Sequence, residues 1–158
     1  MKNLITLILF SLVTTATWGQ DLLVNSYVEQ TNVGPKVGTS IGVGTNFKFE
    51  FGGFYQKAVD VNAPETTPSW TIEQEFYGAY FNYAIAESNH FGLQFNVRTG
   101  VSNGQNFVIT PSLLGSVSPI KTVKLGAGLG VRAFQPTLMG SISIRLGNNK
   151  GTGYIASK

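Results

Sequence analysis

The 158-residue chain contains no cysteine, a single histidine and few charged residues. The absence of cysteine excludes disulfide bonds, and it also excludes the acylated cysteine that anchors a lipoprotein. One histidine without cysteine does not provide the ligand cluster of a transition-metal site. Charged residues make up 12% of the chain, whereas soluble domains typically carry about 25%. Because a surface exposed to water needs more charge than this, something other than water must cover much of the molecule.

The charged residues nearly balance one another and are scattered along the chain. Eleven Lys and Arg residues against eight Asp and Glu residues give a net charge of +3. Nucleic-acid binding calls for a basic patch, which the sequence lacks. The chain after residue 19 also lacks any stretch of 10–15 residues with apolar side chains at helical spacing, so no helix is predicted there.

The N-terminal residues 1–19 have the pattern of a secretory signal peptide. Lys2 gives a positive start, residues 4–13 are a ten-residue apolar stretch, and residues 17–19 offer a cleavage site after Gly19. The apolar stretch is too short for a membrane-spanning helix, which needs about 20 residues. We therefore expect export through the secretory pathway and removal of residues 1–19.

The stretch FGLQFNVRTGVS, residues 91–102, alternates almost strictly between apolar and small or polar side chains. Phe91, Leu93, Phe95, Val97 and Val101 occupy the odd positions. Alternation with a period of two is the mark of a β-strand, whose side chains point to opposite faces.

Seven further segments read as strands and are separated by turn residues such as Asn-Gly and Pro. The eight segments lie near 22–30, 35–45, 47–58, 70–85, 91–102, 107–118, 122–134 and 137–147. Segment 70–85 changes parity, which predicts a β-bulge near 78–81. Eight strands with short connections predict an all-β, eight-stranded antiparallel up-and-down barrel over residues 20–147. A short polar C-terminal tail, residues 148–158, follows it.

The composition of the two strand faces indicates whether each face contacts water, lipid or the barrel interior. The face opposite the apolar residues consists mostly of Gly, Ser, Asn and Thr, whereas the outside of a soluble barrel should be rich in Lys and Glu. Small side chains suit the interior of a narrow eight-stranded barrel, so the apolar face is predicted to contact lipid and the barrel to be transmembrane. A secreted soluble lipocalin-like barrel that carries a small apolar ligand is the alternative.

Several charged residues share the small-polar face and are therefore predicted to lie in the lumen. Because isolated buried charges are unfavourable, they should form ion pairs and plug the lumen. Arg98 in particular should lie within ion-pair distance of Glu50, Glu73 or Glu75. The predicted lumen charges are Glu29, Glu50, Glu73, Glu75, Arg98, Arg132 and Arg145.

Three short patterns suggest chemistry but have simpler structural explanations. Residues 128–133 match the dinucleotide pattern G-x-G-x-x-A, yet they lie inside a strand and no helix follows. His90 follows Glu87 and Ser88 in one turn, and Asp60 lies at the opposite end of the barrel, so a lipid-modifying barrel enzyme is only a weaker alternative. Glu73 and Glu75 share a face without a substrate cleft. We therefore expect no catalytic, cofactor-binding or metal site.

The signal peptide, the eight alternating strands and the final strand LMGSISIRLG resemble the small outer-membrane β-barrel proteins, of which OmpX and the OmpA barrel domain are members. The resemblance covers most of the chain after residue 19 and is one of pattern. It implies a non-enzymatic structural or surface-interaction role in the cell outer membrane. It also implies insertion by the barrel-assembly machinery, a monomeric state, and both termini in the periplasm.

Overall fold

The structure is a computed structural model that describes residues 21–32, 34–44, 48–59, 75–88, 90–120 and 122–146. Several predictions fall outside the described residues: the signal peptide 1–19, the tail 148–158, Asp60, Glu73, and the part of segment 70–85 before Glu75. The eight strands are β1 (Asp21–Thr31), β2 (Gly34–Gly44), β3 (Phe49–Ala58), β4 (Glu75–Glu87), β5 (Phe91–Ser102), β6 (Asn106–Ile120), β7 (Val123–Arg132) and β8 (Gln135–Leu146).

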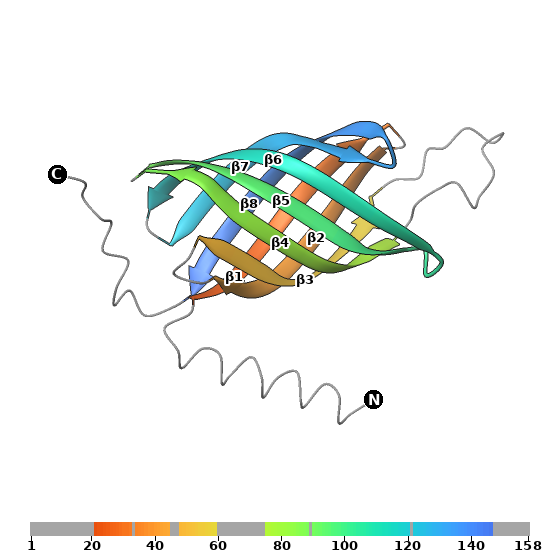
Figure 1. The fold of residues 1–158 in the computed structure, drawn as a ribbon, viewed down its shortest axis with the longest axis horizontal. Coiled ribbons are helices and arrows are strands. Elements are labelled where there is room, and N and C mark those ends of the chain that lie inside the picture. Colours follow the sequence, from red (N-terminus) through yellow and green to blue (C-terminus); the bar gives the residue numbers. More distant parts are fainter. Residues whose placement is uncertain are drawn as a thin grey trace, which may run out of the picture.

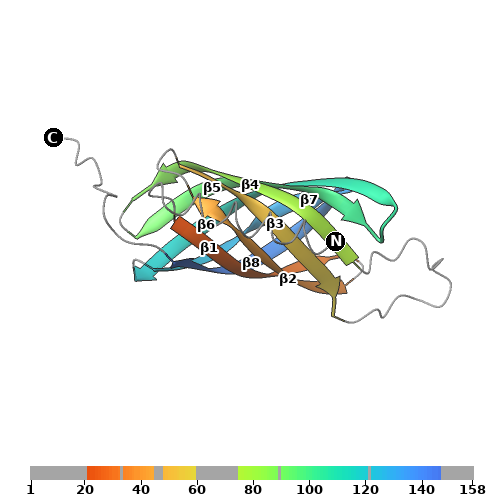
Figure 2. The same cartoon turned by 90° about the horizontal axis from the view of Figure 1, so that it is seen from below.

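The strands form one closed barrel in which each strand pairs antiparallel with its neighbours in sequence (Figures 1 and 2). Closure is made by β1 and β8, which pair from Leu22 opposite Leu146 to Gln30 opposite Leu138. The predicted fold class is confirmed. Among the described residues, no helix is long and apolar enough to cross a membrane.

The barrel has two distinct ends. The start of β1 and the end of β8 lie together at what we call the terminal end, on the left of Figure 1. The connections β2–β3, β4–β5 and β6–β7 lie at this end. The other four connections lie at the opposite, distal end. Two of them have only two residues, the β1–β2 connection and the turn Ala133–Phe134 between β7 and β8.

Burial alternates along the strands as the sequence pattern predicts, and the apolar side chains point outward. On β5, for example, Phe91 is 68% exposed whereas Arg98 is 2% exposed. All eight strands contribute exposed apolar side chains to the outer face. They include Val28, Ile41, Phe51, Phe81, Phe95, Leu113, Leu129 and Ile142.

Glycines let neighbouring strands and lumen side chains approach closely. Gly78 on β4 pairs with Gly100 on β5, and a Cβ atom on either one would collide with backbone atoms of the other strand. Gly38 lies beneath the ring of Tyr27, where a side chain would clash. Small residues on the inner face therefore make room for the few large side chains of the lumen.

Strand β4 differs from the prediction in two ways. The register between β4 and β5 is regular from Phe76 to Ala84, and the irregularity lies between Ala84 and Ala86 rather than near 78–81. Phe76 and Tyr80 point inward and are 1% and 4% exposed. The parity is therefore constant over most of the strand, and large aromatic side chains occupy the lumen there.

Candidate functional site

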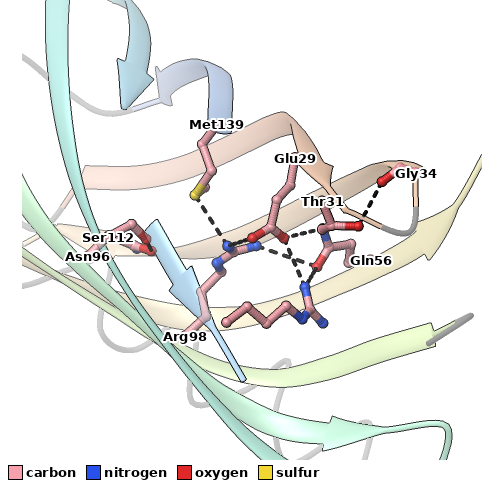
Figure 3. A network of polar contacts seen from close by, with 9 residues as sticks. Glu29, Thr31, Gly34, Gln56, Asn96, Arg98, Ser112 and Met139 are labelled. Carbon is pink, nitrogen blue, oxygen red and sulfur yellow. Dashed lines mark hydrogen bonds and ion pairs between the residues drawn. The ribbon is translucent and has the colours of Figure 1, made fainter. Parts of the chain in front are cut away.

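Glu29 is the centre of a buried polar network in the lumen (Figure 3). Its carboxylate accepts hydrogen bonds from Arg98 Nη2 at 3.0 Å, Arg132 Nη1 at 2.9 Å and Gln56 Nε2 at 2.7 Å. Glu29 and Gln56 are 0% exposed, and both arginines are at most 4% exposed. The four residues come from β1, β3, β5 and β7, so the network links every second strand across the barrel.

Secondary contacts hold both guanidinium groups in place. Gln56 Oε1 accepts a hydrogen bond from Arg132 Nη1 at 2.9 Å, and Arg98 Nη2 lies 3.2 Å from the sulfur of Met139. Arg98 stacks over the ring of Tyr27 at 5.0 Å, and Arg132 stacks over the ring of Phe76 at 4.1 Å. Cation–π contacts of desolvated arginines are favourable. Hydrogen bonds and aromatic rings therefore both stabilise the buried positions of the two arginines.

An apolar cluster packs against this network inside the lumen. Phe54 and Phe76 meet edge to face with ring centroids 4.7 Å apart. Tyr27, Tyr80, Leu114 and Met139 complete the cluster, and each is at most 7% exposed. The lumen at this height is filled by side chains.

A small polar cavity of about 40 Å³ lies beside the network. Two side-chain hydrogen bonds lie in the wall of this cavity. Asn25 donates one to the hydroxyl of Ser40 at 2.9 Å, and Asn96 donates the other to the side-chain oxygen of Asn82. Within the described residues, the Oδ1 atom of Asn25 and the hydroxyl of Tyr27 have no hydrogen-bond partner. Each buried water needs about 10–15 Å³ of cavity volume. This cavity therefore has room for about three water molecules, which would provide hydrogen bonds to these two groups.

The terminal end of the lumen opens into a wider cavity of about 460 Å³, which we call the vestibule. Its charged lining residues are Glu50, Glu87, His90, Lys124 and Arg145. Lys124 Nζ lies 3.5 Å from Glu87 Oε1, and Arg145 lies 3.9 Å from Glu50. Both ion pairs are longer than those of Glu29. Because their side chains are 15–34% exposed, water also reaches them.

Five of the seven predicted lumen charges lie in the lumen, in two separate groups. Glu29, Arg98 and Arg132 meet in the buried network. Glu50 and Arg145 lie apart from it, in the vestibule.

The placement of Glu75 in the lumen is corrected by the structure. Glu75 is exposed on the outer face, where its carboxylate accepts a hydrogen bond from the hydroxyl of Tyr55 at 3.0 Å. Its neighbour Phe76 points inward, and adjacent residues of a strand face opposite sides. Glu73 lies outside the described residues.

The expected partners of Arg98 are corrected as well. Neither Glu50 nor Glu75 forms an ion pair with its guanidinium group, which pairs with Glu29 instead. Gln56 was missed as a member of the network, although it shares the inward parity of Glu50 on the same strand.

The residues of the three short sequence patterns are placed as follows in the part of the chain that the structure describes. Ser88 Oγ accepts a hydrogen bond from the backbone of Phe91, and within the described residues no hydrogen bond joins it to the ring of His90. Gly128 lies within β7 against the backbone of β6 rather than at the start of a helix. The described residues contain no cluster of three or more His, Asp or Glu side chains suited to a metal ion.

Comparison with known proteins identifies the architecture. No protein-family model and no curated protein matches the chain. A solved structure from the de novo design of transmembrane β-barrels matches with a TM-score of 0.64 and 8% identity, covering 80% of this chain and 95% of the designed one. Neisserial surface protein A matches with a TM-score of 0.45 and 15% identity, covering 82% of this chain and 96% of that protein. The likeness to the designed barrel shows that the chain has the fold of a transmembrane β-barrel, a closed barrel of eight antiparallel strands.

Proposed function

We propose that the chain is a small integral protein of the cell outer membrane with a structural or surface-interaction role and a plugged, non-conducting lumen. It is non-enzymatic and monomeric, it reaches the membrane through the secretory pathway, and the barrel-assembly machinery inserts it, as for the OmpX-like proteins that its pattern resembles. The observation that carries the proposal is the continuous band of apolar side chains around the outside of the closed barrel.

The height of this band suits a bilayer. On β5 the outward apolar side chains run from Phe91 to Val101. Ten residue steps of about 3.3 Å, tilted by about 40°, span about 25 Å along the barrel axis. Outer-membrane barrels have an apolar band of about 25 Å, so the barrel height and the bilayer match.

Polar and aromatic residues on the outer face support the same placement. Tyr55 and Glu75 form their hydrogen bond near the distal end of the β3–β4 pair, where Lys57 lies opposite Glu75. Toward the terminal end, the ring of Phe49 packs against that of Tyr83 with centroids 5.2 Å apart. Aromatic residues gather at both membrane interfaces because their rings tolerate the boundary with water.

The soluble alternative fits this distribution poorly. A barrel that carries an apolar ligand needs an apolar interior and a charged exterior. Here the most deeply buried side chains include Glu29, Gln56 and Arg98, whereas Phe91 and Leu129 are 68% and 63% exposed. An apolar exterior of this extent would aggregate in water.

The buried network supports a plugged lumen. A solute crossing the barrel would have to separate Glu29 from both Arg98 and Arg132 and displace the packed ring of Phe76. Separating a buried ion pair is strongly unfavourable, so ions should not pass at a measurable rate.

Membrane fractionation and conductance test the two parts of the proposal separately. We expect the protein in the outer-membrane pellet after an alkaline wash, and recovery from the soluble periplasm would refute the membrane assignment. The purified protein in a planar bilayer should show no steady conductance above that of protein-free lipid. Stable conductance steps would refute the plug but not the membrane location.

A further inference from the structure

We propose that the vestibule binds a small dipolar solute, namely a molecule that carries both a carboxylate and an ammonium group, such as a short peptide. This inference goes beyond the proposed function and does not depend on which membrane holds the barrel. It rests on the size of the vestibule, the arrangement of its charges and the blind inner end of the lumen.

The charges of the vestibule lie on two facing walls. Glu50 and Glu87 belong to the adjacent strands β3 and β4, whereas Lys124 and Arg145 belong to the adjacent strands β7 and β8. In an eight-stranded closed barrel, these two pairs of strands lie opposite each other. The contacts Lys124–Glu87 and Arg145–Glu50 therefore bridge the mouth of the lumen from an acidic wall to a basic wall.

The Lys124–Glu87 pair is the one that a ligand can exchange most easily. Its atoms are 3.5 Å apart, and the side chains are 19% and 34% exposed. Within the described residues neither side chain makes another ion pair or a hydrogen bond. Arg145, by contrast, also contacts Asp21 at 3.4 Å, and Glu50 also accepts a hydrogen bond from Asn82 at 2.8 Å.

Exchange with a dipolar ligand keeps every charge compensated. The ligand carboxylate would take the place of Glu87 beside Lys124, and the ligand ammonium would take the place of Lys124 beside Glu87. A ligand with a single charge would leave one of the two side chains without its partner in a partly desolvated site, which is unfavourable. The arrangement thus selects for molecules with both charges.

The inner end of the lumen makes the vestibule a pocket rather than a passage. Ser143 lines both the vestibule and the small polar cavity, and beyond that cavity the Glu29 network fills the lumen. Its volume of about 460 Å³ is in the range of sites for small molecules, about 300–1,000 Å³. A solute therefore enters and leaves through the terminal end.

The only histidine of the chain provides a reporter for this site. His90 lines the vestibule, so the imidazole signals in an NMR spectrum of the untagged protein in detergent micelles come from one residue at the proposed site. The probe is glycylglycine, which carries both charges. The comparison probes are glycylglycinamide, which lacks the carboxylate, N-acetylglycylglycine, which lacks the ammonium group, and inorganic phosphate, an anion that lacks both.

We expect glycylglycine to shift the His90 signals saturably, and each blocked analogue to bind about tenfold or more weakly. Lys124→Gln should remove the preference for the free carboxylate over the amide, and Glu87→Gln should remove the preference for the free amine over the acetylated one. Both variants retain the buried network, and unchanged gel mobility before boiling would verify that they fold. Lys57→Gln, on the outer face, is the matched control and should bind as the unmodified protein does.

Three results would overturn the proposal. The first is a signal that does not saturate with glycylglycine, and the second is equal affinity for the blocked analogues. The third is saturable binding of phosphate as strong as that of the dipeptide, which would indicate an anion site instead. None of these results bears on membrane location or conductance, so this proposal and the proposed function fail independently.

Discussion

Glu29 lies between two guanidinium groups, so removing its charge and removing one arginine should lower the free energy of unfolding by different amounts. Glu29→Gln keeps the size of the side chain but leaves Arg98 and Arg132 buried without their shared anion. Breaking a buried ion pair from one side costs about 3–5 kcal/mol, and here one substitution breaks two such contacts.

Arg98→Met should be milder because it leaves a neutral pair behind. Glu29 keeps Arg132 at 2.9 Å and Gln56 at 2.7 Å, and methionine fills most of the volume next to Met139. The loss is that of one charged hydrogen bond, about 1.5–3 kcal/mol. Glu29→Gln should therefore exceed Arg98→Met by about 1–2 kcal/mol, and the double variant should cost less than the sum of the two.

Urea titration of the protein refolded into lipid vesicles measures these differences, with gel mobility before boiling as the signal for the folded barrel. Arg145→Met is the control, since its ion pairs are 3.4–3.9 Å long and partly exposed and should contribute less than about 1 kcal/mol. If Arg98→Met destabilises the barrel as much as Glu29→Gln does, the carboxylate is not the shared centre of the network.

Three further tests address the outer face, the glycines and the distal turn. Val97→Arg puts a charge on the outer face and should cost about 2–4 kcal/mol near the bilayer midplane, measured by folding yield in vesicles. Gly128→Ala should cost about 1–3 kcal/mol because its Cβ would meet the backbone of β6, whereas Gly140→Ala has open space and should be neutral in the same urea titration. Ala133→Asn with Phe134→Gly should stabilise the barrel by at least about 1 kcal/mol in thermal unfolding, because φ is 47° and 66° at these positions.

The strands could be predicted from the sequence because alternation is a local signal. Seven of the eight segments agree with the observed strands within a few residues at each end, and segment 91–102 matches β5 from Phe91 to Ser102. The charges on the regular strands β1, β5 and β7 were assigned to the lumen by the same parity argument, and Glu29, Arg98 and Arg132 are all buried there.

Strand β4 shows where the parity argument fails. It assumes that aromatic side chains face outward, but Phe76 and Tyr80 fill the lumen while Tyr77 and Phe81 face outward. Alternation between two sets of aromatic residues does not reveal which set is inside. The error reversed the start of the strand and with it the position of Glu75.

The partner of Arg98 could not be predicted for a different reason. Arg98 and Glu29 are 69 residues apart, on strands β5 and β1 that are not neighbours in the sheet. Their contact depends on the diameter and strand tilt of the barrel, which bring side chains together across the lumen. A sequence pattern contains no information on pairs of this kind.

The central claim is that the odd-numbered positions of β5 contact lipid and the even-numbered positions face the lumen. Because the chain has no cysteine, single cysteines can be introduced at positions 93 to 97 of β5 and labelled with a nitroxide after reconstitution into vesicles. Collision with oxygen, which concentrates in lipid, should be high at 93, 95 and 97 and low at 94 and 96. A reversed alternation, or equal accessibility at all five positions to a water-soluble nickel complex, would contradict the account.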